Sequence, residues 1–302
     1  MKQALVVGSA GQDGTLLTVL LRAHGYNVLG IDQGDLQIEH ASDVEQFVAD
    51  NQPAEIYFLA AFHHSSEDPA IEPRELFERS FAVNAMAVVN FLDAIRKHAP
   101  RTRLFYAASS LIFGDVVEAP QTETTPITPT DAYGISKAAG LHACRHYRRA
   151  YGVHASVGIL YNHESPLRAD KFLSKKVTKA AWEIKRGTRD KLVLGNLAAE
   201  IDWGYAPDFV EAMRRIVALD TADDFIVATG EQHSVQEFVE LAFGALDLDW
   251  RRYVQENRAV ITRAPVTRVG DPSKLARATG WQLSVSFAEM VRLLIEAEAG
   301  AR

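Results

Sequence analysis

A glycine-rich turn directly after the first apolar run constrains the fold of this chain more than any other feature. Apolar residues fill positions 4–7, three glycines follow at three-residue spacing, and leucines at helical spacing come next. Glycine allows a tight turn from strand to helix, and the N–H groups that open a helix bind phosphate. This context predicts a dinucleotide site, with a plain strand–helix turn as the alternative. The residues expected to contact the dinucleotide here are Gly8, Gly11, Gln12, Asp13 and Gly14.

The first half of the chain alternates apolar runs with helical patterns. We expect strands at 4–7, 27–31, 56–61, 103–107 and 155–160, separated by helices that include 43–51, 81–97 and one beginning near Tyr133. Such runs predict an α/β fold with a doubly wound (Rossmann) parallel sheet, buried on both faces. The short stretch after Asp32 indicates that one helix and one strand of a complete nucleotide-binding half are missing.

The pattern becomes less regular after Asn162, with helical segments at 175–185 and 235–246. We expect a smaller C-terminal substrate-binding cap. The predicted division gives the dinucleotide-binding domain 1–162, rejoined by about 202–228, and gives the cap 163–201 and 229–302.

Asp32 follows the second predicted strand, where a carboxylate accepts the ribose hydroxyls and repels a 2′-phosphate. No basic side chain follows immediately, so the expected cofactor is NAD, with NADP as the alternative. Asp32 as a simple turn residue is the structural alternative. Asp35 and Leu36 are expected beside the adenine or in a solvated loop.

Tyr133 and Lys137 lie four residues apart in a predicted helix, and Ser109 ends an upstream strand. A phenol has an ordinary pKa near 10, and we expect the Lys137 ammonium to lower the pKa of Tyr133. Ser109 can then hydrogen-bond a substrate oxygen while Tyr133 moves its proton. The three residues predict an enzyme that transfers hydride between a nicotinamide and a carbonyl or carbinol carbon. An exposed helix-start pair is the alternative for Tyr133 and Lys137 alone.

Composition excludes several other classes of protein. The net charge of −7 does not suit nucleic acid or anionic membranes, so these are not expected partners. The single cysteine, Cys144, excludes an internal disulfide and indicates a buried helix residue in a reducing compartment. The N-terminus carries no long apolar segment and no run approaches 18 apolar residues, so a cytoplasmic protein is expected. No metal-ligand spacing occurs, and no metal is expected.

Further motifs make the chain similar to the extended short-chain dehydrogenase/reductases, the NAD-dependent epimerase/dehydratase family. Within that family it resembles the GDP-mannose 4,6-dehydratase group and its 4-ketoreductase relatives. Besides the glycine turn and the Tyr133/Lys137 pair, the matching segments are Leu59-Ala-Ala61 with His64, Asn162-His-Glu-Ser-Pro166, Lys175-Lys176, Asp202-Trp-Gly204, Ala228-Thr-Gly230 with Ser234-Val235, and Gly270-Asp-Pro-Ser-Lys274.

The resemblance implies further roles. Leu59, Ala60 and Ala61 line the cofactor, and Tyr133 and Lys137 are expected to contact it as well. The implied substrate is a nucleotide-diphosphate sugar, taken first as GDP-linked. It also implies a homodimer, in which helices 81–97 and 133–151 pair as a four-helix bundle. A solvated charge is the alternative for Lys176 and for Arg263, and a loop histidine with a backbone partner is the alternative for His64. The implied substrate contacts are His64, Ser110, Asn162, Lys176 and Arg263.

The chain departs from the dehydratases at positions that matter for chemistry. Those enzymes carry a glutamate two positions after the catalytic hydroxyl, where this chain has Leu111, and an arginine where it has Ile201. Loss of a hydroxyl group needs a base and an acid, and leucine is neither. Asp115, Glu118 and Glu123 are near in sequence as substitutes.

These departures order the expected functions. Reduction of a GDP-linked 4-keto sugar at C4 by NAD(P)H comes first, because it needs only Ser109, Tyr133 and Lys137. A nucleotide-sugar 4,6-dehydratase, or a C4 epimerase, with tightly bound NAD is the alternative. A non-catalytic dinucleotide-binding protein comes last.

Overall fold

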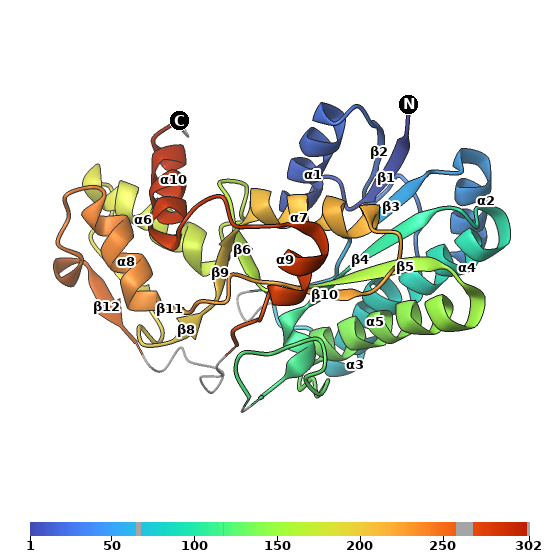
Figure 1. The fold of residues 1–302 in the computed structure, drawn as a ribbon. Helices are drawn as coiled ribbons and strands as arrows, with labels where there is room; N and C mark the ends of the chain where they lie inside the picture. The colour runs from blue at the N-terminus through green and yellow to red at the C-terminus, as the bar shows by residue number, and fades with distance from the viewer. Residues whose placement is uncertain (65–67, 117, 258–267, 301–302) are drawn as a thin grey trace.

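The computed structural model describes residues 1–64, 68–116, 118–257 and 268–300. Its centre is a six-stranded parallel sheet in the order β10-β5-β4-β3-β1-β2 (Figure 1). The predicted doubly wound parallel sheet is therefore confirmed. The strands are β1 (Gln3–Val7), β2 (Asn27–Ile31), β3 (Glu55–Phe58), β4 (Arg103–Ser109), β5 (His154–Leu160) and β10 (Asp224–Val227).

Helices cover both faces of this sheet. On one face lie α1 (Gln12–Ala23) and α7 (Ala206–Ala218), which pack against each other. The other face is covered by α2 (Ala41–Asn51), α4 (Ala87–His98) and α5 (Ala132–Tyr151). Side chains of β1 alternate between the two layers, since Leu5 and Val7 join one hydrophobic cluster and Ala4 and Val6 the other. This two-sided burial explains why the strands read as continuous apolar runs.

The helix predicted at 81–97 begins earlier than expected. It is preceded by α3 (Pro73–Phe81) and by one π-helical segment, η1 (Ala82–Met86), before α4. Pro73 stands in the first turn, where proline is tolerated, and so marks the true start. The expected strand 56–61 is also shorter, because β3 ends at Phe58 and leaves Leu59 to Ala61 as a loop.

The short connection after Asp32 has the predicted consequence. Strand β2 forms the edge of the sheet, and the chain returns through α2 to place β3 on the other side of β1. One strand and one helix of a complete nucleotide-binding half are thus missing, as expected. The reversal between β1 and β3 creates the crevice at the carboxyl edge where such sheets bind ligands.

A second region, seen on the left of Figure 1, has its own hydrophobic cluster. Its helices are α6 (Leu173–Lys185), α8 (Val235–Gly244) and α10 (Phe287–Gly300). Short strand pairs join it together: β6 (Asn162–Glu164) with β9 (Trp203–Tyr205), β8 (Glu200–Ile201) with β11 (His233–Ser234), and β7 (Leu192–Leu194) with β12 (Val254–Glu256). Two short 3₁₀ segments, η2 (Ser110–Phe113) and η3 (Trp250–Arg252), and helix α9 (Ser273–Thr279) complete the described elements.

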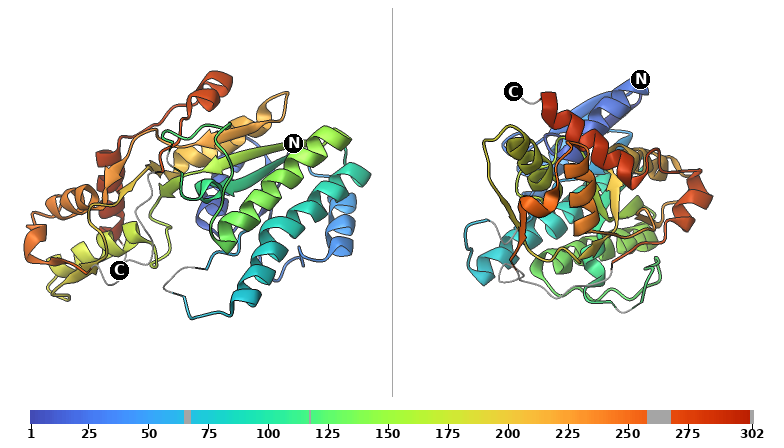
Figure 2. Two further views of the ribbon diagram at one scale, coloured as in Figure 1. Left: turned by 90° about the horizontal axis from the view of Figure 1, so that it is seen from below. Right: turned by 90° about the vertical axis from the view of Figure 1, so that its left-hand side faces the viewer.

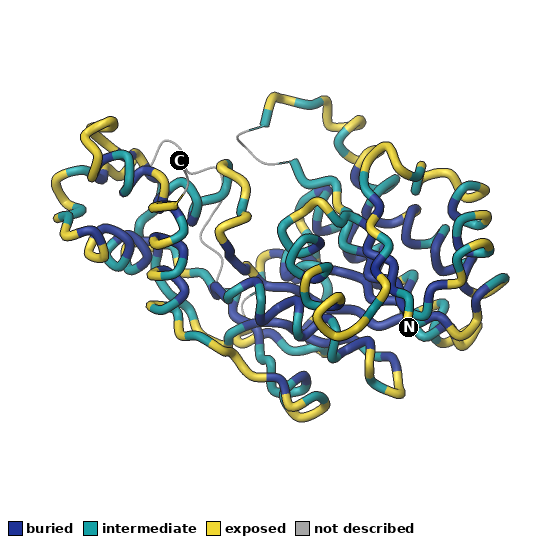
Figure 3. The backbone as a smooth tube through the Cα atoms, turned by 90° about the horizontal axis from the view of Figure 1, so that it is seen from above, coloured by how far each residue is buried: buried dark blue, intermediate teal, exposed yellow. Residues whose placement is uncertain are grey.

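Buried residues follow the central strands, and a separate group of buried residues lies in the second region (Figure 3). Leu275 and Trp281 pack with the sheet's cluster rather than with the second region. The residue boundaries predicted for the two domains stay a prediction. Across the described parts of the chain, no helix has the length and apolarity needed to cross a bilayer.

Candidate active site

The glycine turn between β1 and α1 has no room for side chains at two of its three glycines. Gly8 has φ +90°, and a Cβ there would lie 2.8 Å from the Ala60 amide nitrogen. A Cβ on Gly14 would lie 2.1 Å from the Gly8 carbonyl oxygen. Only glycine lets the turn close this tightly against the loop after β3. Gly11, in contrast, lies at the cavity wall and precedes the first turn of α1.

Asp32 fastens the end of β2 to this turn. Its carboxylate accepts hydrogen bonds from the Ser9 hydroxyl and from the Ala10 amide, at 2.9 Å for the latter. The Asp35 carboxylate accepts in turn from the Asp32 amide at 2.8 Å. Asp32 therefore has a structural role, as one alternative foresaw, and it also lines the cavity beside the turn. Its charge stays available to repel a phosphate.

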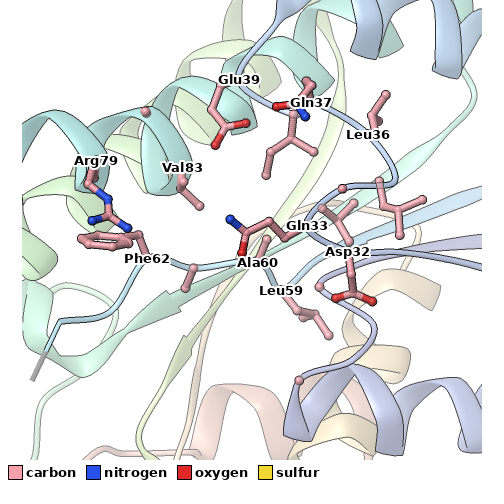
Figure 4. Close-up of a pocket in the computed structure, with 18 residues that line it drawn as sticks. Asp32, Gln33, Leu36, Gln37, Glu39, Leu59, Ala60, Phe62, Arg79 and Val83 are labelled. Atoms are coloured by element: carbon pink, nitrogen blue, oxygen red, sulfur yellow. The ribbon is translucent and has the colours of Figure 1, made fainter. Parts of the chain in front are cut away.

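A cavity of about 700 Å³ opens beside Asp32 and the turn (Figure 4). Arg79 and Asp32 stand on opposite sides of it, and the Arg79 guanidinium stacks on the Phe62 ring at 4.3 Å. Glu39 adds a second carboxylate to the wall. The cavity includes the predicted cofactor residues Gly8, Gly11, Asp32, Leu36, Leu59, Ala60 and Ala61.

A second cavity, of about 460 Å³, continues from the first, because Leu59 and Ala61 line both. The ends of β4 and β5 form its floor, and α5 and the segment after β6 form its sides. Through these shared residues, the two cavities extend from the glycine turn to the predicted catalytic residues. The second cavity contains Ser109, Ser110, Leu111, Tyr133, Lys137 and Asn162.

Ser109, Tyr133 and Lys137 meet in this second cavity, as the sequence predicts. The Ser109 hydroxyl accepts a hydrogen bond from the Leu111 amide at 3.2 Å and caps η2. Lys137 is buried, and its Nζ donates to the Ala107 carbonyl at 2.8 Å and lies 5.7 Å from the centre of the Tyr133 ring.

The prediction that Lys137 lowers the pKa of Tyr133 below its ordinary value is wrong in this arrangement. Desolvation raises the pKa of Tyr133, and the charges of Asp13 and Asp131 act in the same direction. Desolvation also lowers the pKa of Lys137 to about 7, which weakens its positive charge. The cation that opposes the rise in the Tyr133 pKa is Arg168, a cavity residue that the sequence did not single out.

Comparisons with known proteins bear on this site. A family model described as GDP-mannose 4,6 dehydratase matches residues 33–294. GDP-mannose 4,6 dehydratase 2 of Arabidopsis thaliana is 36% identical to the chain, and the match covers 98% of this chain and 86% of the relative. This chain belongs to the GDP-mannose 4,6-dehydratase family. The GDP-mannose 4,6-dehydratase of Yersinia enterocolitica is 32% identical, over 96% of this chain and 92% of the relative.

Membership in this family confirms the predicted resemblance. It makes the chain a nucleotide-sugar enzyme of the short-chain dehydrogenase/reductase class, which is the coarser part of the predicted function. The relatives named above are dehydratases, so they support the predicted alternative better than the ketoreductase that the sequence ranked first.

Solved structures share the fold at low sequence identity. RMD from Pseudomonas aeruginosa, complexed with NADPH, has a TM-score of 0.87 at 20% identity and covers both chains fully. The dTDP-glucose 4,6-dehydratase of Bacillus anthracis, in complex with NAD, has a TM-score of 0.84 at 17% identity, over 99% of this chain and 97% of that chain. At these identities the likeness shows that the fold is shared; one of these structures holds NADPH and the other holds NAD.

Two motifs of the family resemblance turn out to bind each other. The Gln12 side chain donates to the His163 carbonyl at 3.1 Å and pairs with the Ser165 hydroxyl at 2.8 Å. Asp13 pairs with the His163 ring at 2.8 Å, and the other ring nitrogen meets the Tyr161 carbonyl at 2.7 Å. Gln12 and Asp13, predicted as cofactor residues, thus hold the turn to β6, and Asp13 lines the catalytic cavity.

Burial and pairing have opposite effects on the pKa values of Asp13 and His163, and pairing determines the direction of both shifts. Desolvation alone would raise the pKa of Asp13, but His163 outweighs it and the pKa is lowered. Desolvation opposes the charge of His163 as well, yet Asp13 raises its pKa. His163 also stacks on Phe209 at 4.5 Å. The pair therefore joins the glycine turn, β6 and α7 at one point.

The remaining predicted substrate residues lie in different places. Ser110 and Asn162 line the catalytic cavity. His64 hydrogen-bonds the Pro69 carbonyl at 2.9 Å, and the neighbouring His63 lines the cavity instead. Lys176 is half-buried on α6, away from the walls of both cavities. Arg263 lies outside the described residues.

The departures from the dehydratase pattern also face the cavity. Leu111 and Ile201 both line it, so apolar side chains occupy the wall where the family resemblance implies a glutamate and an arginine. None of the acidic residues suggested as substitutes lines it among the described residues. Glu123 instead accepts from the Ile226 amide at 2.9 Å, and Asp115 and Glu118 are exposed.

Two buried side chains that support the site were missed at the sequence level. Asp202 is fully buried and accepts from the Thr229 amide and hydroxyl, at 2.9 and 2.7 Å, and from the Gly230 and Gly270 amides. It therefore joins three motifs of the resemblance into one loop cluster. Asn84, in the π-helical segment η1, bonds both the Phe62 amide and the Phe62 carbonyl, at 2.9 and 3.0 Å.

Proposed function

We propose that the protein is a 4,6-dehydratase of a GDP-linked hexose of the GDP-mannose type, with a nicotinamide dinucleotide that is not consumed. Support comes from relatives of that name that match 96–98% of the chain. The observation that carries the proposal is the union of Ser109, Tyr133 and Lys137 in one cavity that continues into a dinucleotide-sized cleft.

The residues that line the cleft have different roles in the proposed reaction. Gly8, Gly11, Asp32 and Leu59 to Ala61 would hold the dinucleotide, which would supply a hydride acceptor for C4 and a hydride donor for C6. Tyr133 takes the proton of the C4 hydroxyl, which Ser109 orients. Lys137, anchored by its bond to Ala107, stays beside the phenol and the ribose. Ser110 and Asn162, on the cavity wall, contact the sugar diphosphate.

A 4-ketoreductase is the second candidate, and Leu111 is the observation that favours it. Reduction of a 4-keto sugar needs a proton donor and no base at C5, so an apolar residue in this wall is compatible with the reaction. The first candidate needs a proton-transfer group from elsewhere in the cavity. C4 epimerisation, like reduction, needs a proton-transfer group at the C4 oxygen and no base at C5, but it recycles its hydride.

Cofactor stoichiometry separates the candidates. We expect purified protein with catalytic NAD to convert GDP-mannose over many turnovers, with release of a 4-keto-6-deoxy product and no net change in reduced cofactor. Product identity by mass spectrometry distinguishes loss of water from epimerisation. Consumption of one NAD(P)H per 4-keto sugar, with no reaction of GDP-mannose, would establish the reductase instead.

Three further properties belong to the same proposal. NAD is preferred to NADP because Asp32 and Glu39 give the nucleotide end two carboxylates. The protein forms a homodimer through α4 and α5, which lie side by side in Figure 2. Exposed Met86 and Tyr151 near this face support that pairing, and light scattering on the purified protein tests it. A cytoplasmic location stays a prediction.

A further inference from the structure

Dehydration requires more proton-transfer groups in the cavity than oxidation at C4 does. After C4 becomes a ketone, one group must take the proton from C5 and one must protonate the departing C6 hydroxyl. Ser109, Tyr133 and Lys137 are occupied at the C4 oxygen. Leu111 faces the cavity and transfers no proton. This requirement rests on the proposed dehydratase function.

Few groups in the described wall of the cavity remain for that task. Asp13 and His163 are committed to each other at 2.8 Å. Arg168 is an arginine, which stays protonated at any working pH. Glu200 lies on β8 and is exposed. His63 is half-buried and lies beside Tyr133.

His63 is held close to the catalytic phenol. Its ring meets the Tyr133 ring edge-on, with centroids 5.0 Å apart, and packs against Phe172 at 5.8 Å. It follows β3, the strand next to β4, whose end carries Ser109. In a hexose C5 is bonded to C4, and C6 is bonded to C5. A group next to Tyr133 therefore lies near both carbons when the C4 oxygen is at the phenol.

The backbone before His63 is fixed from within the fold. Asn84 bonds both polar groups of the Phe62 backbone, and its amide also donates to the Ser136 hydroxyl at 3.0 Å. Ser136 lies between Tyr133 and Lys137 on α5. One buried amide thus sets the loop that carries His63 and the helix that carries Tyr133 relative to each other.

We propose that His63 is the catalytic acid–base of the elimination step. The neutral imidazole takes the C5 proton, the C5–H electron pair forms the C5–C6 double bond, and the C6–O bond breaks. The imidazolium gives that proton to the departing hydroxyl, which leaves as water. The imidazole ends neutral, and the sugar has lost one water with no change in its total oxidation level. Histidine suits this task because its ordinary pKa lies close to neutral.

The test is a single-turnover experiment with GDP-mannose, comparing His63→Asn with the wild type. We expect His63→Asn to oxidise C4 normally and then stall, so that reduced nicotinamide absorbance persists and 4-keto-6-hydroxy sugar accumulates. Water loss and deuterium uptake at C5 from heavy water should fall roughly 10²-fold or more. Calorimetric affinity for GDP-mannose should stay within about twofold, because the lost group acts on protons rather than on binding.

Two matched variants sharpen the result. Glu200→Gln changes the other candidate base on the same wall and is expected to keep both half-reactions. Adding Leu111→Glu to His63→Asn places a carboxylate in the cavity, and at least partial recovery of C5 exchange is expected. Added imidazole should likewise rescue His63→Gly but not Tyr133→Phe.

The outcomes separate the two proposals. A wild-type protein that never dehydrates GDP-mannose overturns the proposed function and this inference with it. A wild type that dehydrates, together with a His63→Asn variant that loses water at the normal rate, overturns the inference alone. The same holds if Glu200→Gln stalls after oxidation while His63→Asn does not.

Discussion

The two ends of the cleft are built in different ways. The nucleotide end is formed within positions 7–83 of the chain, mainly by the glycine turn, the end of β2 with the segment after it, and the loop after β3. The catalytic end takes side chains from β4, α5, the segment after β6 and β8, which are far apart in the chain. The Asp13–His163 pair connects the two ends. Local backbone geometry thus makes a binding surface, whereas the chemistry depends on long-range side-chain contacts.

The largest expected effect separates the two ends directly. Tyr133→Phe should lower kcat roughly 10²–10⁴-fold, because it removes the only group that handles the C4 proton. Affinity for NAD, measured by fluorescence titration, should be unchanged, since the nucleotide end does not include this phenol. A variant with near-normal kcat would show that the chemistry does not depend on Tyr133.

Removing the pair that connects the ends should reduce stability in a pH-dependent way. The pKa of His163 is raised above 6.5, so its contribution is complete below that pH and is lost as the pH rises through the raised pKa. The pKa of Asp13 is lowered below 3.8, so its contribution is complete above that value and is lost as the pH falls through the lowered pKa. His163→Gln should therefore be most destabilising between pH 3.8 and pH 6.5, where it should lower the free energy of unfolding by roughly 3–5 kcal/mol.

Urea unfolding at a series of pH values checks this expectation. The difference between wild type and His163→Gln should narrow as the pH rises into the alkaline range. His98→Gln is the control, because it removes a histidine–carboxylate pair with Glu45 at the surface and should have little effect. An equal loss at every pH would mean that His163 stabilises the fold by packing on Phe209 and not by charge.

At the nucleotide end, a single methyl group should disrupt binding. Gly14→Ala places a Cβ 2.1 Å from the Gly8 carbonyl, so the turn must open and NAD affinity should fall about tenfold or more. Gly244→Ala on α8 is the matched control, since nothing lies within 4 Å of its Cβ. That substitution should raise stability by about 0.5–1 kcal/mol and leave NAD binding alone. Equal NAD affinity in both variants would contradict the role of the turn.

The same difference between the ends explains what could be predicted from the sequence. The glycine turn, Asp32 and the compressed half-fold were predictable, because each follows from a recognisable pattern of strand, turn and segment length in the sequence. Ser109, Tyr133 and Lys137 were predictable because their spacing places them at one edge of the sheet. The roles of Asp202, Asn84 and Arg168 were not, because no sequence pattern around these residues indicates which groups they contact. The sign of the Tyr133 pKa shift failed for a related reason: helical spacing gives the distance to Lys137 but not the desolvation of both groups.

The smallest expected effect concerns the choice between the two dinucleotides. Asp32→Asn keeps an oxygen that can accept from the Ala10 amide but removes the charge that faces the cavity. A 2′-phosphate is then no longer repelled, and the ratio of NAD to NADP affinity should fall about tenfold, which corresponds to about 1.4 kcal/mol. Glu39→Gln removes the other carboxylate of the same wall and separates a specific contact from general negative potential. Arg79, on the opposite side, is the only cationic side chain among the described residues of that wall. Equal changes from both substitutions would show that the preference for NAD arises from the summed negative charge of the wall. A change from Asp32→Asn alone would assign it to the ribose contact, and the nucleotide end would then carry one specific side-chain determinant on its backbone frame.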